Sequence, residues 1–203
     1  MSGIVPSVSL SGYFQEVVEG AIKTQKVEAT GSATHYLVGL LSDYAKPGKH
    51  AEETLDRSLT LLFDEAMRHP DPGERFERLR ILGDGVLYTS GFFRDHIESR
   101  GVDPKYVEGI GAAAYHAAGG MMAHKSSRDL SVVDIFDELS TKFSSFVAVV
   151  SEVAHITFAS SGGGTSKGIV RVYERWLKTG NSSLAKTLGE HGLISTGGKG
   201  ILQ

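Results

Sequence analysis

The stretch Ile81-Leu-Gly-Asp-Gly-Val-Leu-Tyr-Thr-Ser-Gly-Phe-Phe93 is almost wholly apolar or small, and it decides the fold. A second stretch of this kind is Gly109-Ile-Gly-Ala-Ala-Ala-Tyr-His-Ala-Ala-Gly-Gly-Met-Met122. Each glycine inside a helix costs about 1 kcal/mol relative to alanine, so several on one helix need a compensating gain. Close approach of a neighbouring helix supplies that gain. The two stretches therefore predict closely packed Gly/Ala-rich helices at the centre of an all-α fold.

Helical spacing of apolar residues continues outward from both stretches, and no segment alternates with period two over five or more residues. Asp71 can cap a helix, Pro72 suits its first position, and Glu74 completes a capping-box-like arrangement. Helices are expected over residues 11–22, 36–44, 55–66, 72–99, 104–124, 131–158, 167–178 and 183–192. The sequence thus predicts a single-domain antiparallel bundle of about seven or eight helices over residues 1–203. A flexible loop is expected at 160–166 and a loose C-terminal tail at 195–203.

Composition removes several function classes. The chain has 203 residues, no cysteine and a formal charge of -3. The absence of cysteine excludes disulfide scaffolds, cysteine-ligated metal centres and cysteine nucleophiles. The net charge provides no strong nucleic-acid signal. No apolar run approaches the length of a membrane span, and the N-terminal residues lack a secretory pattern, so we expect a cytoplasmic protein.

One face of the helix expected at 104–124 carries a stripe of small residues and histidines. Gly109, Ala113, His116, Gly120 and His124 share this face, because steps of three and four residues return to the same side. The stripe either lets a neighbouring helix approach closely or leaves a groove for a flat ligand beside His116. Close packing is the alternative that we favour, and it predicts that Gly120→Leu overpacks the core.

Asp84 lies in the most apolar part of the sequence, where a carboxylate must be hydrogen-bonded, paired or protonated. It either accepts hydrogen bonds from a neighbouring tyrosine or helix end, or it lines a cleft together with Tyr88. Tyr115 and the two histidines of the stripe extend the second alternative. The candidate ligand-binding residues are therefore Asp84, Tyr88, Tyr115, His116 and His124.

A basic stripe on the helix expected at 167–178 is a candidate anion-binding surface. Lys167, Arg171, Arg175 and Lys178 fall within about 80° of one another on this helix. Such a stripe attracts phosphates, acidic lipids or an acidic protein face, although most such stripes are solvated surface.

Catalytic signatures are incomplete. Glu152-Val-Ala-His155 has the spacing used by di-metal bundles, but it occurs once where those proteins need two copies, so no metal site is predicted. No Gly-x-Ser-x-Gly nucleophile elbow is present. A single histidine such as His116 could still offer an axial ligand to haem.

Three strings resemble a family of uncharacterised all-helical proteobacterial proteins of about this length. They are Leu82-Gly-Asp-Gly-Val-Leu-Tyr-Thr-Ser-Gly-Phe-Phe93, Gly111-Ala-Ala-Ala-Tyr115 and Tyr173-Glu-Arg-Trp-Leu-Lys-Thr-Gly180. The resemblance covers most of the chain and implies a bacterial cytoplasmic helical protein. It carries over no catalytic residue, and Gly85 stands where the family is expected to have a hydroxyl residue.

These observations favour a non-enzymatic binding or regulatory module that recognises a protein partner or a small hydrophobic ligand. The recognition surface is expected on the helices at 72–99 and 104–124. The alternative is an enzyme or sensor with haem or another cofactor against the Gly109/Ala113/His116/Gly120 stripe. The sequence leaves homo-oligomerisation open.

Overall fold

The computed structural model describes residues 10–46, 57–125, 130–162, 172–173, 175–177 and 180–190. Those residues form helices and connecting segments without a strand, which confirms the all-α fold class. No helix among them is long and apolar enough to cross a membrane. The chain divides into two compact units, Met1–Ser151 and Glu152–Gln203. The boundary lies within a helix rather than in the Gly/Ser-rich run at 160–166.

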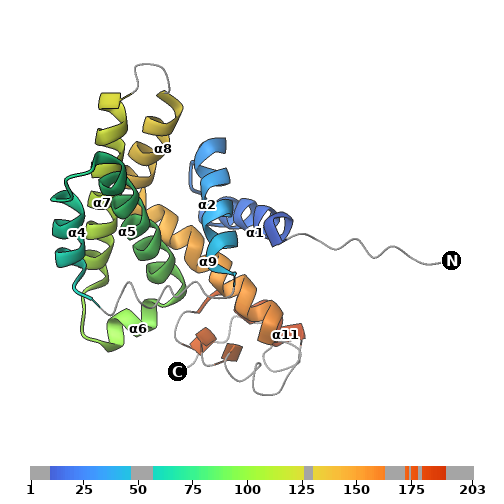
Figure 1. Ribbon diagram of the computed structural model, residues 1–203. Helices are drawn as coiled ribbons and strands as arrows, with labels where there is room; N and C mark the ends of the chain where they lie inside the picture. The colour runs from blue at the N-terminus through green and yellow to red at the C-terminus, as the bar shows by residue number, and fades with distance from the viewer. Residues whose placement is uncertain are drawn as a thin grey trace. The chain divides into compact units, whose positions relative to one another are not determined.

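The first unit is built from the contacting helices α1 and α2 and a central group of helices (Figure 1). The most extensive pairing in the central group joins α5 and α7, which run in opposite directions. The helices are α1 (Leu10–Gln25), α2 (Gly31–Tyr44), α4 (Leu59–Met67), α5 (Pro72–Phe92), α6 (Arg94–Ser99), α7 (Pro104–Lys125), α8 (Leu130–Thr141) and α9 (Phe143–Gly162). The last of these continues into the second unit.

Buried glycines allow the close packing that the sequence predicts at the centre of this unit. A Cβ atom on Gly83 of α5 would lie 2.7 Å from the Tyr115 ring of α7. A Cβ on Gly111 of α7 would lie 2.4 Å from the Phe143 ring of α9. Since such separations are far below van der Waals contact, these positions accept only glycine without rearrangement. Close packing of Gly/Ala-rich helices is therefore confirmed.

The start of α5 matches its sequence signature. The Asp71 side chain accepts a hydrogen bond from the backbone N–H of Glu74 at 2.8 Å, and Pro72 occupies the first turn. The end of the helix differs from the prediction of one helix over 72–99. Phe93 leaves the helical conformation, with φ −124° and ψ 31°, and α6 begins after it. Thr89 donates its hydroxyl proton to the Gly85 carbonyl at 2.7 Å, a bond that favours bending, and Gly91 weakens the last turn.

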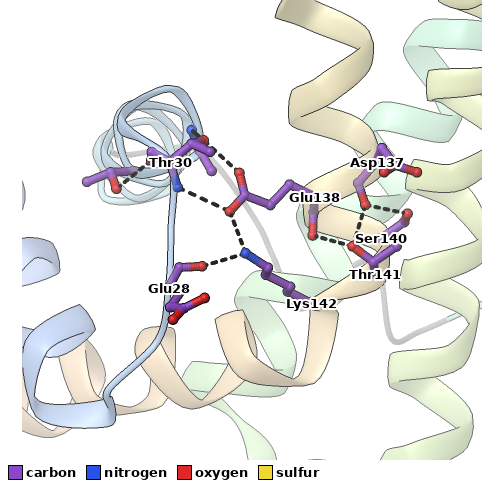
Figure 2. Close-up of polar contacts among 9 residues, drawn as sticks. Glu28, Thr30, Asp137, Glu138, Ser140, Thr141 and Lys142 are labelled. Atoms are coloured by element: carbon purple, nitrogen blue, oxygen red, sulfur yellow. Dashed lines mark hydrogen bonds and ion pairs between the residues drawn. The ribbon is translucent and has the colours of Figure 1, made fainter.

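The prediction of a single helix over 131–158 is also wrong, because a turn at Lys142 separates α8 from α9. Hydroxyl side chains in the last turn of α8 donate hydrogen bonds to a backbone carbonyl of the same helix, as Figure 2 shows. Ser140 and Thr141 both donate to the Asp137 carbonyl, at 2.9 and 2.8 Å. Bonds of this kind bend helices, and here the regular helix is interrupted one residue later. α9 runs to Gly162, so residues 160–162 are helical rather than part of a loop.

A polar latch consisting of Glu28, Thr30, Glu138 and Lys142 ties the segment between α1 and α2 to the end of α8 (Figure 2). Thr30 is the N-cap of α2 and donates its backbone N–H and its hydroxyl to the buried Glu138 carboxylate, at 3.1 and 2.6 Å. Lys142 Nζ donates to the same carboxylate at 3.2 Å and to the Glu28 carbonyl at 2.7 Å. Burial acts to raise the pKa of Glu138, but the bonds from Thr30 and Lys142 outweigh it and hold the pKa below its ordinary value.

We expect Glu138→Gln to lower the free energy of unfolding by about 1–2 kcal/mol at neutral pH, because charge-assisted hydrogen bonds are lost. A lowered pKa in the folded state means that this contribution is present above the ordinary value of 4.5 and is lost as the pH falls through the folded value. Urea unfolding of both proteins should therefore show a difference that shrinks on acidification. The exposed neighbour Asp137→Asn is the control, and a pH-independent difference would contradict the prediction.

The second unit contains the rest of α9, helical residues at 172–173 and 175–177, and α11 (Ser182–Glu190). Its core consists of Ala159, Val172, Leu184 and Leu188, with the partly buried Trp176 packed against them. The predicted tail at 195–203 and most of the helix predicted at 167–178 lie outside the described residues.

Candidate functional site

Asp84 forms a buried hydrogen-bond network that joins three helices. The hydroxyls of Tyr36 on α2 and Tyr115 on α7 both donate to Asp84 Oδ1, at 2.6 and 2.7 Å. Arg80, one turn earlier on α5, donates from Nη1 to Oδ2 at 2.8 Å. Arg80 is itself held by two further bonds to the Glu77 carboxylate. Of the two alternatives for Asp84, the structure shows the one in which neighbouring tyrosines donate to the carboxylate.

Burial governs the protonation of this network. It raises the pKa of Asp84, and the bonds from Tyr36, Tyr115 and Arg80 only partly oppose it. Burial and the adjacent Asp84 carboxyl also raise the pKa values of Tyr36 and Tyr115 far above the ordinary value of 10.0. Both tyrosines therefore keep their protons at neutral pH and act as donors. With both carboxylate oxygens occupied, Asp84 is arranged to hold α2, α5 and α7 together.

Tyr88 lies apart from this network. Its ring stacks on Tyr44 of α2 and on Phe92, with centroids 4.6 Å away in both cases. Tyr115 is fully buried and contacts the rings of Phe136 and Phe143 as well as Tyr36. The structure thus brings Asp84 and Tyr115 together through a hydrogen bond, whereas Tyr88 belongs to an aromatic stack between α2 and α5.

The small-residue stripe of α7 points outward. Gly109, Ala113, His116 and Gly120 share a face, as predicted, but all four are exposed. A Cβ atom on Gly109 or Gly120 would have nothing within 4 Å. The close helix approach predicted at these two glycines is therefore wrong. The face that packs is the opposite one, which carries Gly111, Ala114, Tyr115 and Ala118, because Tyr115 and its apolar neighbours gain more from burial than the small stripe does.

His116 is exposed and is not among the described hydrogen-bond partners of Asp84. A flat cofactor against the stripe would lie at the exposed surface of α7, beside His116. His124 is on α7 as well, but its side chain lies outside the described part of the structure.

An apolar groove of about 490 Å³ lies at one end of the central helices and is partly open to solvent. Met67 ends α4, Pro72 and Phe76 come from the first turns of α5, and Met121 and Met122 come from the last turns of α7. Ala117 and Gly120 complete the α7 wall, so part of the small-residue stripe borders this groove. The small residues Ala117 and Gly120 leave space along the α7 side of the groove, which Phe76 and Met67 line from α5 and α4.

Arg75 carries the one charge among the described residues that line this groove. Its Nε and Nη2 both donate to the His69 carbonyl, at 3.0 and 2.8 Å. This carbonyl belongs to the segment between α4 and α5. The paired bonds fix the guanidinium group at the edge of the groove.

The candidates in the second unit are only partly described. Arg175 is half-buried and lies 4.7 Å from the centroid of the Phe158 ring. Lys167, Arg171 and Lys178 lie outside the described residues, so the anion-binding stripe stays a prediction.

Glu152 and His155 are both buried in this unit, with Oε2 and Nδ1 4.0 Å apart. The side-chain amide of Asn181, before α11, donates to Glu152 Oε2 at 2.8 Å. Across the described residues, no group of three or more His, Asp or Glu side chains is placed to hold a metal ion.

Comparison with known proteins identifies no relative of this chain. Neither a protein-family model, nor a curated protein, nor a solved structure matches the chain. The resemblance to helical proteobacterial proteins therefore stays a prediction, and function must be argued from the residues.

The groove was not among the sites expected from sequence. Phe76 and Met67 belong to helices that sequence patterning alone does not bring next to the end of α7. One signal was available, since Met121 and Met122 directly follow Gly119 and Gly120. Flexible thioethers beside residues without side chains are typical of adaptable binding surfaces.

Proposed function

We propose that this chain is a non-enzymatic binding module that takes a small apolar ligand in the groove between α4, α5 and α7. The single observation that carries the proposal is the groove itself, with its volume of about 490 Å³ and its lining of apolar side chains around one arginine. Ligand sites in proteins commonly have volumes of roughly 300–1,000 Å³ and combine an apolar lining with a few placed polar groups.

The lining residues support a ligand that is flexible in shape. Methionine side chains have three rotatable bonds and a polarisable sulfur, so they adapt to irregular apolar surfaces. Met67 lines the groove from α4, Met121 and Met122 line it from α7, and Phe76 adds a flat aromatic face. Met67 is 41% exposed, so an apolar ligand that covers it would gain hydrophobic stabilisation.

The test is binding of the neutral dye N-phenyl-1-naphthylamine, whose fluorescence rises in an apolar environment. We expect the wild-type protein to bind it and Gly120→Leu to weaken binding about tenfold, or about 1.4 kcal/mol, because the leucine occupies the groove. A Cβ atom added to Gly120 would have no neighbour within 4 Å, so the folded protein should tolerate the change.

The matched control is Gly109→Leu, which places the same side chain at another exposed position of α7 with equally open surroundings outside the groove. It should bind the dye like wild type. Equal losses in the two variants, or no dye binding by the wild-type protein, would contradict the proposal. Thermal melting of each variant checks that the fold is intact.

A further inference from the structure

Arg75 combines a charge with a fixed position at an otherwise apolar groove. A guanidinium group has five N–H donors in a planar arrangement. The two bonds to the His69 carbonyl use Nε and Nη2, and neither uses Nη1. The backbone carbonyl thus orients the side chain, and within the described part of the chain no hydrogen bond is made by its second terminal nitrogen.

The acidic residues Asp71 and Glu74, close to Arg75 in the sequence, interact with other groups. Asp71 Oδ1 accepts the Glu74 backbone N–H at 2.8 Å as the N-cap of α5. The exposed Glu74 carboxylate lies 3.8 Å from Arg78, one turn further along the helix. Neither carboxylate is among the groove-lining residues, so among the described residues that line the groove the charge is the positive one of Arg75.

An apolar surface with one oriented cation matches a particular class of molecule. The apolar body of a ligand would cover Phe76 and the methionines, and a single anionic end group would accept hydrogen bonds from Arg75. A neutral ligand would leave the guanidinium group facing apolar matter and would lose part of its hydration without compensation.

We propose that the ligand of this groove is an amphipathic monoanion, an apolar chain or ring that ends in one carboxylate, and that Arg75 binds the carboxylate. This inference rests on the proposed function, because it names the ligand class of the same groove. It makes Arg75 the specificity-determining residue and leaves affinity for the apolar body to the other lining residues.

The experiment compares decanoate with decanol, which share a chain and differ in charge near neutral pH, as competitors of N-phenyl-1-naphthylamine. In Arg75→Met we expect decanoate to compete about tenfold less well than in wild type, because a charge-assisted hydrogen bond is lost. Decanol and the dye itself should bind as before. The control Arg78→Met removes a charge of the same sign from the next turn, outside the groove, and should leave both competitors unchanged.

Arg75 also donates hydrogen bonds to the His69 carbonyl, so its removal could disturb the segment between α4 and α5. A second variant separates that structural effect from the loss of charge. Arg75→Gln keeps a donor for that carbonyl and removes the charge, and it should show the same selective loss for decanoate. Unchanged competition by decanoate in both Arg75 variants would overturn the inference while leaving dye binding, and with it the proposed function, intact. Failure of the dye to bind wild type would overturn the proposed function instead.

Discussion

Replacing Asp84 with alanine should lower the free energy of unfolding by about 3–5 kcal/mol, measured by urea denaturation. The reason is the pair of hydroxyls that the substitution leaves without their acceptor. Tyr115 is fully buried and Tyr36 is half-buried, and both donate to Asp84 Oδ1. Each buried donor left unsatisfied costs about 1–3 kcal/mol, and the lost side chain leaves a cavity in addition.

The matched variant Asp84→Asn separates hydrogen bonding from charge. Both tyrosines donate to the same oxygen, so an asparagine carbonyl at that position can accept both bonds. Arg80 would lose one partner but would keep its two bonds to Glu77. We therefore expect Asp84→Asn to cost less than about 1 kcal/mol. Equal destabilisation by alanine and asparagine would show that the charge of Asp84, rather than its acceptor role, holds the helices together.

The pH dependence of Asp84 has the opposite sign to that of Glu138. Because burial raises the pKa of Asp84 in the folded protein, its contribution to stability is complete below the ordinary value of 3.8 and declines as the pH rises through the folded value. The free energy of unfolding of wild type relative to Asp84→Asn should thus fall as the pH rises. Glu138, with its lowered pKa, loses its contribution in the acidic direction.

Patterning along the chain was sufficient to predict the all-α fold class and the need of Asp84 for a partner. It could not identify Tyr36 as that partner, because Tyr36 lies 48 positions away on another helix. It also missed the interruptions at Phe93 and Lys142. There, threonine and serine hydroxyls donate to backbone carbonyls within chain segments whose apolar spacing stays helical.

The packed face of α7 could not be predicted from residue spacing, for a physical reason. Small residues occur on all sides of this helix, so the contrast between an apolar and a polar face is weak. Spacing then groups residues into faces without showing which face is buried. Tyr115 is the largest side chain of the stretch from Gly109 to Met122, and its burial decides the orientation. The groove at the end of α7 was missed for a related reason, since it depends on which helix faces Gly120.

A closely packed glycine and an exposed glycine should respond to the same alanine substitution with opposite changes in the free energy of unfolding. A Cβ on Gly91 of α5 would lie 2.7 Å from Val150 Cβ and 3.1 Å from the Ser151 backbone nitrogen of α9. Neither atom can move without shifting the α9 backbone. We expect Gly91→Ala to lower the free energy of unfolding by about 2–3 kcal/mol despite the higher helix propensity of alanine.

Gly109→Ala is the matched comparison, since Gly109 lies inside α7 with open space around it. There the gain in helix propensity is unopposed, and the free energy of unfolding should rise by about 0.5–1 kcal/mol. Urea denaturation of the two variants beside wild type measures both changes. If Gly109→Ala were destabilising, the stripe would be packed against another element and the outward orientation of this face would be wrong. A tolerated Gly91→Ala would mean that α5 and α9 are further apart than the glycine contact indicates. Close packing of the central helices would then depend on glycines such as Gly83, Gly111 and Gly119.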